Sequence, residues 1–348
     1  WERIESWNVG LDFAALNNRL QGTLEYFNRT TRDMVGPPSP LPFTLGTGQP
    51  SENNATLVSK GWEAELKWRD YVGKVNYGLR LVLSDDIQTV TQYYNPTGSL
   101  STWYAGRRMG EIWGYTTAGI AKTNDEMNEH LQHNRPSWGD NWQAGDIMYK
   151  DLNDDNTVNG GANTLSDHGD LRRLGYNAPR FKVGFNADLT WQGLDFSFFL
   201  QGVGRRDWFD NSPYSVGATS HGQWQSVGFK EHWDFFRPEG DPNGANLNAR
   251  YPRPLFEKGS KNMQTQSRYV VNAAYLRIKN IQLGYTLPAS LTKKIGVSRL
   301  RVYTSADNLV TFTKLPKIFD PEATGGDWGP GKIYPLQRVI SCGLNVNI

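Results

Sequence analysis

RFKVGFNADLTWQGLDFSFFLQG, residues 180–202, is the stretch that decides the fold. Apolar and polar residues alternate on both sides of a Gln192-Gly193 pair, and the apolar set is Phe181, Val183, Phe185, Ala187, Leu189, Trp191, Leu194, Phe196, Phe198 and Leu200. A period of two residues indicates β-strands with one apolar and one polar face, and a two-residue connection that ends in glycine predicts a hairpin. Each strand has about ten residues, the length with which a tilted strand crosses a bilayer.

The composition narrows the class of protein. The 348 residues carry a net charge of +2, which argues against a nucleic-acid-binding protein. The mean hydropathy is −0.61, and no segment approaches the roughly 18 apolar residues of a membrane helix, but barrel strands spread their hydrophobicity through alternation. The single cysteine, Cys342, rules out an internal disulfide. Because the chain opens on Trp1 without a signal peptide, we expect it to be processed or part of something longer.

The same alternation recurs along the rest of the chain. It predicts about nine long strands, near residues 7–13, 20–26, 62–68, 75–83, 181–191, 194–200, 275–287, 300–304 and 340–348. The apolar parity slips between Ile278 and Ile281, which indicates a β-bulge. Polar stretches rich in Gly and Pro predict loops over 33–56, over 91–179 with short strands around 112–120, from the hairpin to about 268, and over 320–332.

Short turns and long loops alternate strictly in this series. A soluble sandwich has no reason to place every short turn at one end, whereas an outer-membrane barrel has short periplasmic turns and long external loops. We therefore expect an all-β, antiparallel transmembrane β-barrel, of which this chain forms about nine to ten strands. Trp68 and Trp191, near the short turns, would join an interfacial aromatic girdle unless they are ordinary sheet core. Because bacterial barrels have an even number of strands and no open edges, we expect a further strand before Trp1.

Several stretches of the chain together resemble one family. They are WERIESWNVGLDFAALNNRLQGTLEYFNRTTRDMV, SKGWEAELKW, GDIMYKDLNDDNTVN, LGYNAPRFKVGFNADLTWQGLDFSFFLQGVGRRD, YLRIKNIQLGYTLPASLTKKIGVSRLRVY and YPLQRVISCGLNVNI. In this order they are similar to the C-terminal barrel portion of SusC/RagA-type TonB-dependent outer-membrane transporters. The last residue departs from the pattern, because outer-membrane barrels commonly end on an aromatic residue and this chain ends on Ile348.

The resemblance implies a barrel of about 22 strands with an N-terminal plug, so residues 1–348 would be the C-terminal part of one barrel domain without the plug. It implies a location in the bacterial outer membrane, a SusD-like surface lipoprotein as a partner, and energy from TonB acting through N-terminal segments outside this sequence. Members import oligosaccharides or, in some cases, peptides. We expect import of a bulky nutrient, an oligosaccharide rather than a peptide, and no enzyme activity.

One loop carries a candidate metal site. Its candidate Ca²⁺ ligands are Asp151, Asn153, Asp155, Thr157 and Asp170. Oxygen donors on alternate positions are typical of the start of an EF-hand-like loop. Asn156 stands where Gly is usual, which is tolerable because Asn adopts left-handed conformations. The twelfth position is Ala162 and not Glu, so Asp170, or else Asp167, would have to complete a site that stiffens the loop. The alternative is an Asx-rich turn bonded to its own backbone.

Other candidate groups have a structural interpretation beside the functional one. Tryptophans in the predicted loops, at positions 103, 113, 138, 142, 208, 224, 233 and 328, could stack on a ligand, but each is better explained as filler of a loop core. The polar parity of the strands would line a wet lumen with Glu63, Glu65, Lys67, Arg80, Asp188, Asp195, Arg301 and Asp307.

No catalytic constellation emerges, because the histidines are scattered through the loops at His130, His133, His168, His221 and His232. Two alternatives to the TonB-dependent importer remain open: a passive porin and a secreted glycan-binding β-protein. The barrel prediction requires the apolar residues of the strands to face lipid. It fails if Trp62, Phe185, Phe196 and Leu344 pack beneath a second sheet.

Overall fold

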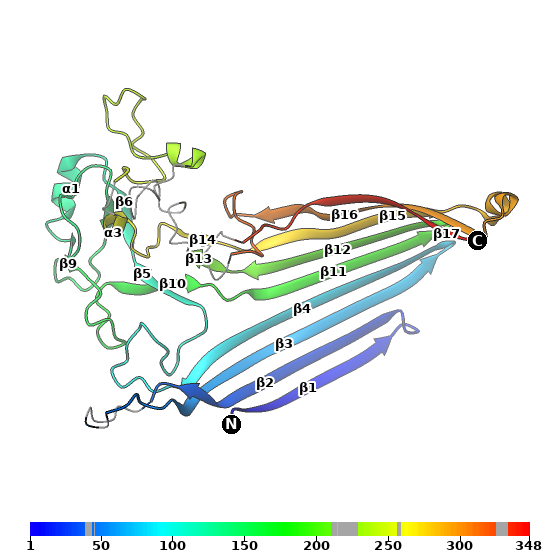
Figure 1. Cartoon of the computed structure of the whole chain (residues 1–348), viewed down its shortest axis with the longest axis horizontal. Helices are drawn as coiled ribbons and strands as arrows, with labels where there is room; N and C mark the ends of the chain where they lie inside the picture. Colours follow the sequence, from blue (N-terminus) through cyan, green and yellow to red (C-terminus); the bar gives the residue numbers. More distant parts are fainter. Residues whose placement is uncertain (39–43, 45, 210–213, 215–228, 256–258, 325–332) are drawn as a thin grey trace.

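The chain is built around one nine-stranded antiparallel sheet (Figure 1). The computed structural model describes residues 1–38, 44, 46–209, 214, 229–255, 259–324 and 333–348. The sheet strands, in spatial order, are β1 (Arg3–Ala15), β2 (Leu20–Gly36), β3 (Glu52–Val72), β4 (Val75–Gln92), β11 (Arg180–Trp191), β12 (Leu194–Arg205), β15 (Tyr275–Thr286), β16 (Arg299–Thr313) and β17 (Val339–Asn347). The spatial order of these strands follows their order in the chain, so the sheet is a meander.

The connections confirm the predicted alternation. Residues 16–19, 73–74, 192–193 and 287–298 make the short connections at one end of the sheet, the last of them with α4 (Ala289–Thr292) and η3 (Lys293–Ile295). Residues 37–51, 93–179, 206–274 and 314–338 make the long connections at the other end (Figure 1). The long loops therefore gather at one end of the sheet, as the external loops of a barrel do.

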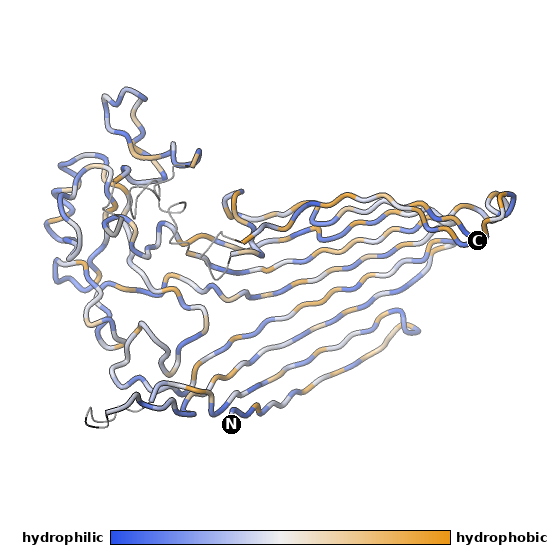
Figure 2. Tube along the Cα trace, viewed as in Figure 1, coloured by the Kyte–Doolittle hydropathy of each residue, from blue (hydrophilic) through white to orange (hydrophobic). Residues whose placement is uncertain are grey.

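The register places the alternating apolar side chains of the predicted strands on one face, whereas a few others, such as Phe199 opposite Asn186 and Val82 opposite Gly184, lie on the polar face. Phe185 lies opposite Leu81 of β4 and Leu200 of β12, and the alternation is visible along each strand in Figure 2. Trp62 is 38% exposed and Leu344 is 65% exposed. In the described part of the chain, the other sheets are two-stranded and belong to the loops, so no second sheet covers this face. The chain thus forms a segment of an all-β barrel wall with an apolar outside.

Several strands extend further than predicted. β3 has 21 residues and β4 has 18, so the loop predicted over 33–56 is reduced to residues 37–51. The ladder between β2 and β3 continues toward the long-loop end of the sheet through pairs such as Met34 with Ala55 and Gly36 with Glu52. Residues 52–56 (ENNAT) do not alternate between apolar and polar, and Ala55 and Thr56 are buried at 1% and 7% exposure. The pattern of a lipid-facing strand is therefore missing there, while the backbone hydrogen bonds continue. The predicted bulge is confirmed, because the register of β15 shifts between Ile278 and Asn280.

The long loops fold into small elements of their own. The loop after β4 holds β5 (Glu111–Tyr115), β6 (Thr117–Ile120), α1 (Asn124–His130), β7 (Arg135–Pro136), β8 (Ile147–Tyr149), β9 (Thr157–Val158) and β10 (Leu171–Tyr176). The loop after β12 holds β13 (Asp207–Phe209), η2 (Lys230–Trp233), α3 (Gly259–Asn262) and β14 (Val270–Asn272). β5 and β6 confirm the short strands expected near 112–120. None of the described helices has the length and apolar character needed to cross a membrane.

Candidate functional site

The polar face of the sheet carries the side chains predicted to line the lumen. Glu65 accepts a hydrogen bond from Arg80 Nε at 3.0 Å and also pairs with Lys67. Asn280 Nδ2 donates to Asp307 Oδ1 at 2.6 Å, while Glu63 and Asp188 are exposed. Pairs of this kind, open to water, contribute about 0–1 kcal/mol each. They make this face of the wall hydrophilic.

One of these pairs crosses a whole strand. Arg301 Nε on β16 donates to Asp195 Oδ2 on β12 at 2.9 Å, although β15 lies between the two strands. Gly284 of β15 makes this possible, because a Cβ there would lie 2.5 Å from Arg301 Nη2 and 2.6 Å from Asp195 Oδ2. The sequence places both charges on the polar parity, but only the register brings them together over a glycine.

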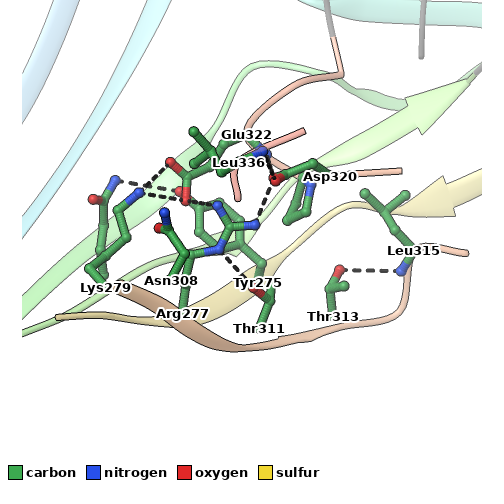
Figure 3. A network of polar contacts seen from close by, with 12 residues as sticks. Tyr275, Arg277, Lys279, Asn308, Thr311, Thr313, Leu315, Asp320, Glu322 and Leu336 are labelled. Atoms are coloured by element: carbon green, nitrogen blue, oxygen red, sulfur yellow. Dashed lines mark hydrogen bonds and ion pairs between the residues drawn. The ribbon is translucent and has the colours of Figure 1, made fainter. Parts of the chain in front are cut away.

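A buried network attaches the loop after β16 to the polar face (Figure 3). Arg277 of β15 is 3% exposed and binds Asp320 Oδ1 and Glu322 Oε1, both at 2.7 Å, while its Nε donates to Thr311 Oγ1 at 2.7 Å. Lys279 Nζ adds a pair with Glu322 Oε2 at 2.9 Å. Arg presents its donors in a fixed fork that suits two carboxylates at once. The network holds residues 320–322 against the lumen side of β15.

The charge state of this network follows from the same contacts. Burial by itself raises the pKa of the Asp320 carboxyl, but hydrogen bonds from the Glu322 N–H, from Arg277 and from the Leu336 N–H outweigh it and hold that pKa below its usual range. Asp320 therefore stays ionised and fixes two parts of its own loop as well as the strand. Packing of Leu315 and Phe319 against Trp208 and Ala273 adds an apolar anchor beside it.

A second buried network joins the two largest loops. Asp146 is fully buried and pairs with Arg253 at 2.9 Å and with Lys261 at 2.8 Å, and Lys261 is itself 3% exposed. Burial raises the pKa of Asp146, but hydrogen bonds from Arg253, Lys261 and Asn262 more than offset this and leave the pKa lowered. Around this network lies a core whose fully buried members include Ile147, Tyr149, Val158 and Tyr269. The loops after β4 and β12 thus form one packed body.

Three of the loop tryptophans belong to apolar clusters, Trp138 and Trp142 in the loop body and Trp208 in the cluster with Leu315 and Phe319. Trp208 is 4% exposed, and Trp138 and Trp142 pack on the core around Tyr149, with ring centroids at 5.1 and 6.1 Å. Trp103 and Trp113 are half-buried. Trp233 differs, because it is 61% exposed and lies at the end of η2. Trp224 and Trp328 lie outside the described residues.

The candidate calcium loop folds as a series of turns around its carboxylates. Asp151 accepts backbone hydrogen bonds from Asn153, Asp154 and Asn156, and Asp155 accepts one from Thr157. Asn156 has φ +64°, the left-handed conformation that makes Asn tolerable in place of Gly at that position. These contacts are those of Asx turns, which can coexist with a metal because each carboxylate oxygen has two lone pairs.

The two downstream acids have different positions. Asp170 is fully buried and accepts from Leu152 N at 2.7 Å and from Asn159 N at 2.8 Å. Its pKa is raised, first by burial and also by the charges of Asp151 and Asp155. Asp167 instead accepts from Ala162 N, in the turn that follows. In the described residues no three His, Cys, Asp or Glu side chains converge as a metal site, so a cation here would also need amide and backbone oxygens.

The described histidines are structural in their contacts. His130 and His232 bind the backbone oxygens of Tyr149 and Tyr214, at 2.7 and 2.9 Å, and His133 contacts the side chain of Asn156 at 2.9 Å. Burial lowers the pKa of His130. His221 lies outside the described residues.

A sheet with an apolar outer face, a charged inner face and packed loops at one end defines the wall of an outer-membrane barrel. Comparison with curated proteins places this chain beside TonB-dependent receptors. It is 26% identical to TonB-dependent receptor P3 of Formosa agariphila over 99% of this chain and 34% of that protein. It is 24% identical to TonB-dependent receptor SusC of Bacteroides thetaiotaomicron over 99% of this chain and 32% of that protein. The chain therefore spans about a third of the length of these relatives.

Solved structures agree on the fold. The RagAB peptide transporter superposes with a TM-score of 0.70 at 24% identity, covering 99% of this chain and 35% of the neighbour. The open-open state of the RagAB peptide importer gives 0.73 at 23% identity, covering all of this chain and 35% of the neighbour. No family model matches the chain. The predicted resemblance to SusC/RagA-type transporters is confirmed, and with it the location in a bacterial outer membrane, where such receptors reside.

Sequence reasoning missed the residues that hold the loops. Arg277 and Lys279 share the polar parity of β15, and this signal could have found them. Their partners Asp320 and Glu322 stand in a loop whose composition gives no hint of where it folds. Asp146 was missed for the same reason, since Arg253 follows it by 107 residues.

Proposed function

We propose that this chain supplies part of the barrel wall and the external loops of a TonB-dependent importer of a bulky nutrient. The observation that carries the proposal is the nine-stranded sheet with opposite faces for lipid and water, together with similarity to TonB-dependent receptors along its length. Its relatives are named as receptors and its structural neighbours as transporters, and this favours transport over catalysis.

The partners follow from the same similarity. A SusD-like surface lipoprotein would cover the loop end of the sheet, and TonB would act through segments other than this chain. The packed body formed by the loops after β4 and β12 supports this arrangement, because a lid needs a surface that keeps its shape. Copurification of the full protein with a surface lipoprotein tests the lid, and isolation of the transporter alone from mild detergent contradicts it.

The nutrient is proposed to be an oligosaccharide, with a peptide as the second candidate. The exposed ring of Trp233 supports the first, since a flat aromatic surface can stack on a sugar. The description of RagAB as a peptide transporter motivates the second. Uptake of labelled oligosaccharides and of labelled peptides should be compared in cells with and without the transporter gene, in the presence and absence of TonB. Uptake that persists without TonB would indicate a passive porin instead.

We also propose that the loop over residues 151–170 binds a structural Ca²⁺. Asp151, Asn153, Asp155, the backbone of Thr157 and Asp170 would provide the oxygen ligands that Ca²⁺ prefers. The buried Asp170 beside two further carboxylates supports the proposal, because a cation would relieve their repulsion. Chelation should speed protease cleavage near Gly160 in the wild type and should not change it in Asp155→Ala. Equal cleavage of the wild type with and without chelator would refute the site.

A further inference from the structure

A groove lies on the lumen side of the sheet, next to the loop that Arg277 holds in place. Its volume is about 480 Å³, within the range of small-ligand pockets. The wall of the groove is formed by β4, β11 and β12, and Pro321 and Glu322 close it on the side of the loop. The loop after β16 therefore completes the groove by folding inward over the polar face.

Gly184 of β11 lines the groove and, because it has no side chain, leaves space in it. A Cβ at this position would meet nothing closer than Phe199 Cε2 at 3.8 Å and Val82 Cβ at 3.9 Å, and both are ordinary contacts. The backbone of Gly184 is not in the left-handed region, so a larger side chain would be accepted by the strand. Such a side chain would fill the groove, which gives a way to block it without straining the sheet.

Among the described charged side chains around the groove, one cation has no carboxylate partner. Lys182 is paired with Asp86 at 2.8 Å, and Glu322 is paired with Arg277 and Lys279. Arg206, half-buried at the rim, donates to two backbone oxygens, Asn177 O at 2.8 Å and Pro321 O at 3.2 Å. Among the described residues no carboxylate pairs with it and its Nη2 has no hydrogen-bond partner. Burial lowers the pKa of Arg206, as expected of a guanidinium without a counter-ion.

Neutral hydrogen-bonding groups lie beside this cation. Gln201 Nε2 approaches Tyr275 Oη at 3.4 Å, and both side chains line the groove. Planar guanidinium donors suit a carboxylate, and the amide and hydroxyl suit the neutral oxygens or nitrogens next to it. We propose that this groove binds a carboxylate group of the transported nutrient, with Arg206 contacting the anion and Gln201 and Tyr275 contacting the adjoining neutral atoms.

This inference rests on the proposed import function and adds an acidic class of nutrient to it. A carboxylate can be carried by an acidic peptide or by an oligosaccharide that contains uronic acids. Two matched pairs of probes separate these sources: mixed-sequence peptides with Glu and the same peptides with Gln, and an oligouronate and its carboxyl-reduced neutral counterpart. Binding is measured on the purified full-length transporter, and TonB-dependent uptake is measured in cells.

Four variants locate the effect. Arg206→Met should weaken binding of the acidic probe of one pair by about ten- to hundredfold, the range for one charge-assisted hydrogen bond. Binding of the neutral probe of the same pair should not change. Arg206→Lys, which keeps the charge, should retain part of the affinity. Gly184→Leu should weaken acidic binding with Arg206 intact, and Asn186→Leu, two residues along the same face, should have no effect.

Three results would overturn the proposal. They are wild-type protein that binds neither acidic probe more tightly than its neutral counterpart, equal losses for acidic and neutral probes in Arg206→Met, and normal acidic binding in Gly184→Leu. Failure of the import function would be seen separately, as uptake by wild-type cells that does not depend on TonB.

Discussion

The sheet and the loop body of this chain are stabilised in opposite ways. The loops bury their apolar residues, and Tyr149, Tyr269, Met127 and Ile147 are among the largest fully buried side chains. The sheet leaves its apolar residues outside, with Val9 at 67% and Ile340 at 69% exposure. Lipid replaces the core for the strands, whereas the loops stand in water and must build a core.

The polar groups of the two regions differ in the same way. The sheet distributes exposed pairs such as Glu65 with Arg80 over a wet face, where each contributes little. The loop body concentrates its charge at Asp146, which no water reaches. A buried pair is costly to break, because the remaining partner is left as an unpaired charge. The loops should therefore be sensitive to polar substitutions and the sheet to charges on its apolar face.

The largest effect is expected from Asp146→Ala. It leaves the buried Lys261 without its carboxylate, which costs about 3–5 kcal/mol and should open the loop body while the sheet persists. Hydrogen exchange should rise in residues 93–179 and 206–274, with the heat-modifiable gel shift of the barrel retained. Glu129→Ala, at an exposed position of α1, is the control. Unchanged exchange in the loops would mean that Asp146 does not hold them together.

A lysine on either face of β12 tests the sheet. Phe198 lies on the apolar face opposite Ala187 and Ile281, and its neighbour Ser197 lies on the polar face. Phe198→Lys should cost about 2–4 kcal/mol if the position lies near the bilayer midplane, measured by denaturant unfolding in lipid vesicles. Ser197→Lys should be close to neutral. Similar costs for the two variants would contradict the assignment of the faces.

Acid should loosen the loop body by a smaller amount. The folded pKa of Asp146 is lowered, so its contribution is present above the unfolded pKa of about 3.9 and is lost as the pH falls through the lower folded value. The loss is smaller than in Asp146→Ala because the protonated group still fills its site. Pepsin cleavage of the loops should increase below about pH 4 in the wild type, with a weaker pH dependence in Asp146→Asn.

The smallest perturbation uses the single cysteine. Cys342 is exposed, and it lies on the apolar face of β17 opposite Thr304. A polarity-sensitive dye on Cys342 should report an apolar surrounding in vesicles and be quenched by spin-labelled lipid. The same dye on Ser341→Cys in a Cys342→Ser background should report water. Stability should change by less than about 0.5 kcal/mol. Quenching at both positions would remove the distinction between the faces.

Local sequence was sufficient to predict a strand wherever one of its faces meets lipid and the other meets water. The nine strands, their turns and the bulge near Ile278 follow from alternation, because each side chain faces either lipid or water. The first residues of β3 were not predicted, since residues 52–56 lack the alternation and Ala55 and Thr56 are buried. The positive φ of Asn156 was predictable from the motif, but the burial of Asp170 was not.

The sequence by itself determined the two-faced strands and the order of turns and loops, because these depend on neighbours two residues apart. Only the tertiary structure decided which loop residues meet: Asp320 with Arg277, and Asp146 with Lys261. These pairs join segments far apart in the chain, and their free energy comes from burial that exists only after the loops have folded onto each other or onto the wall. The groove beside Gly184 and Arg206 belongs to the same category, since the inward fold of one loop completes it.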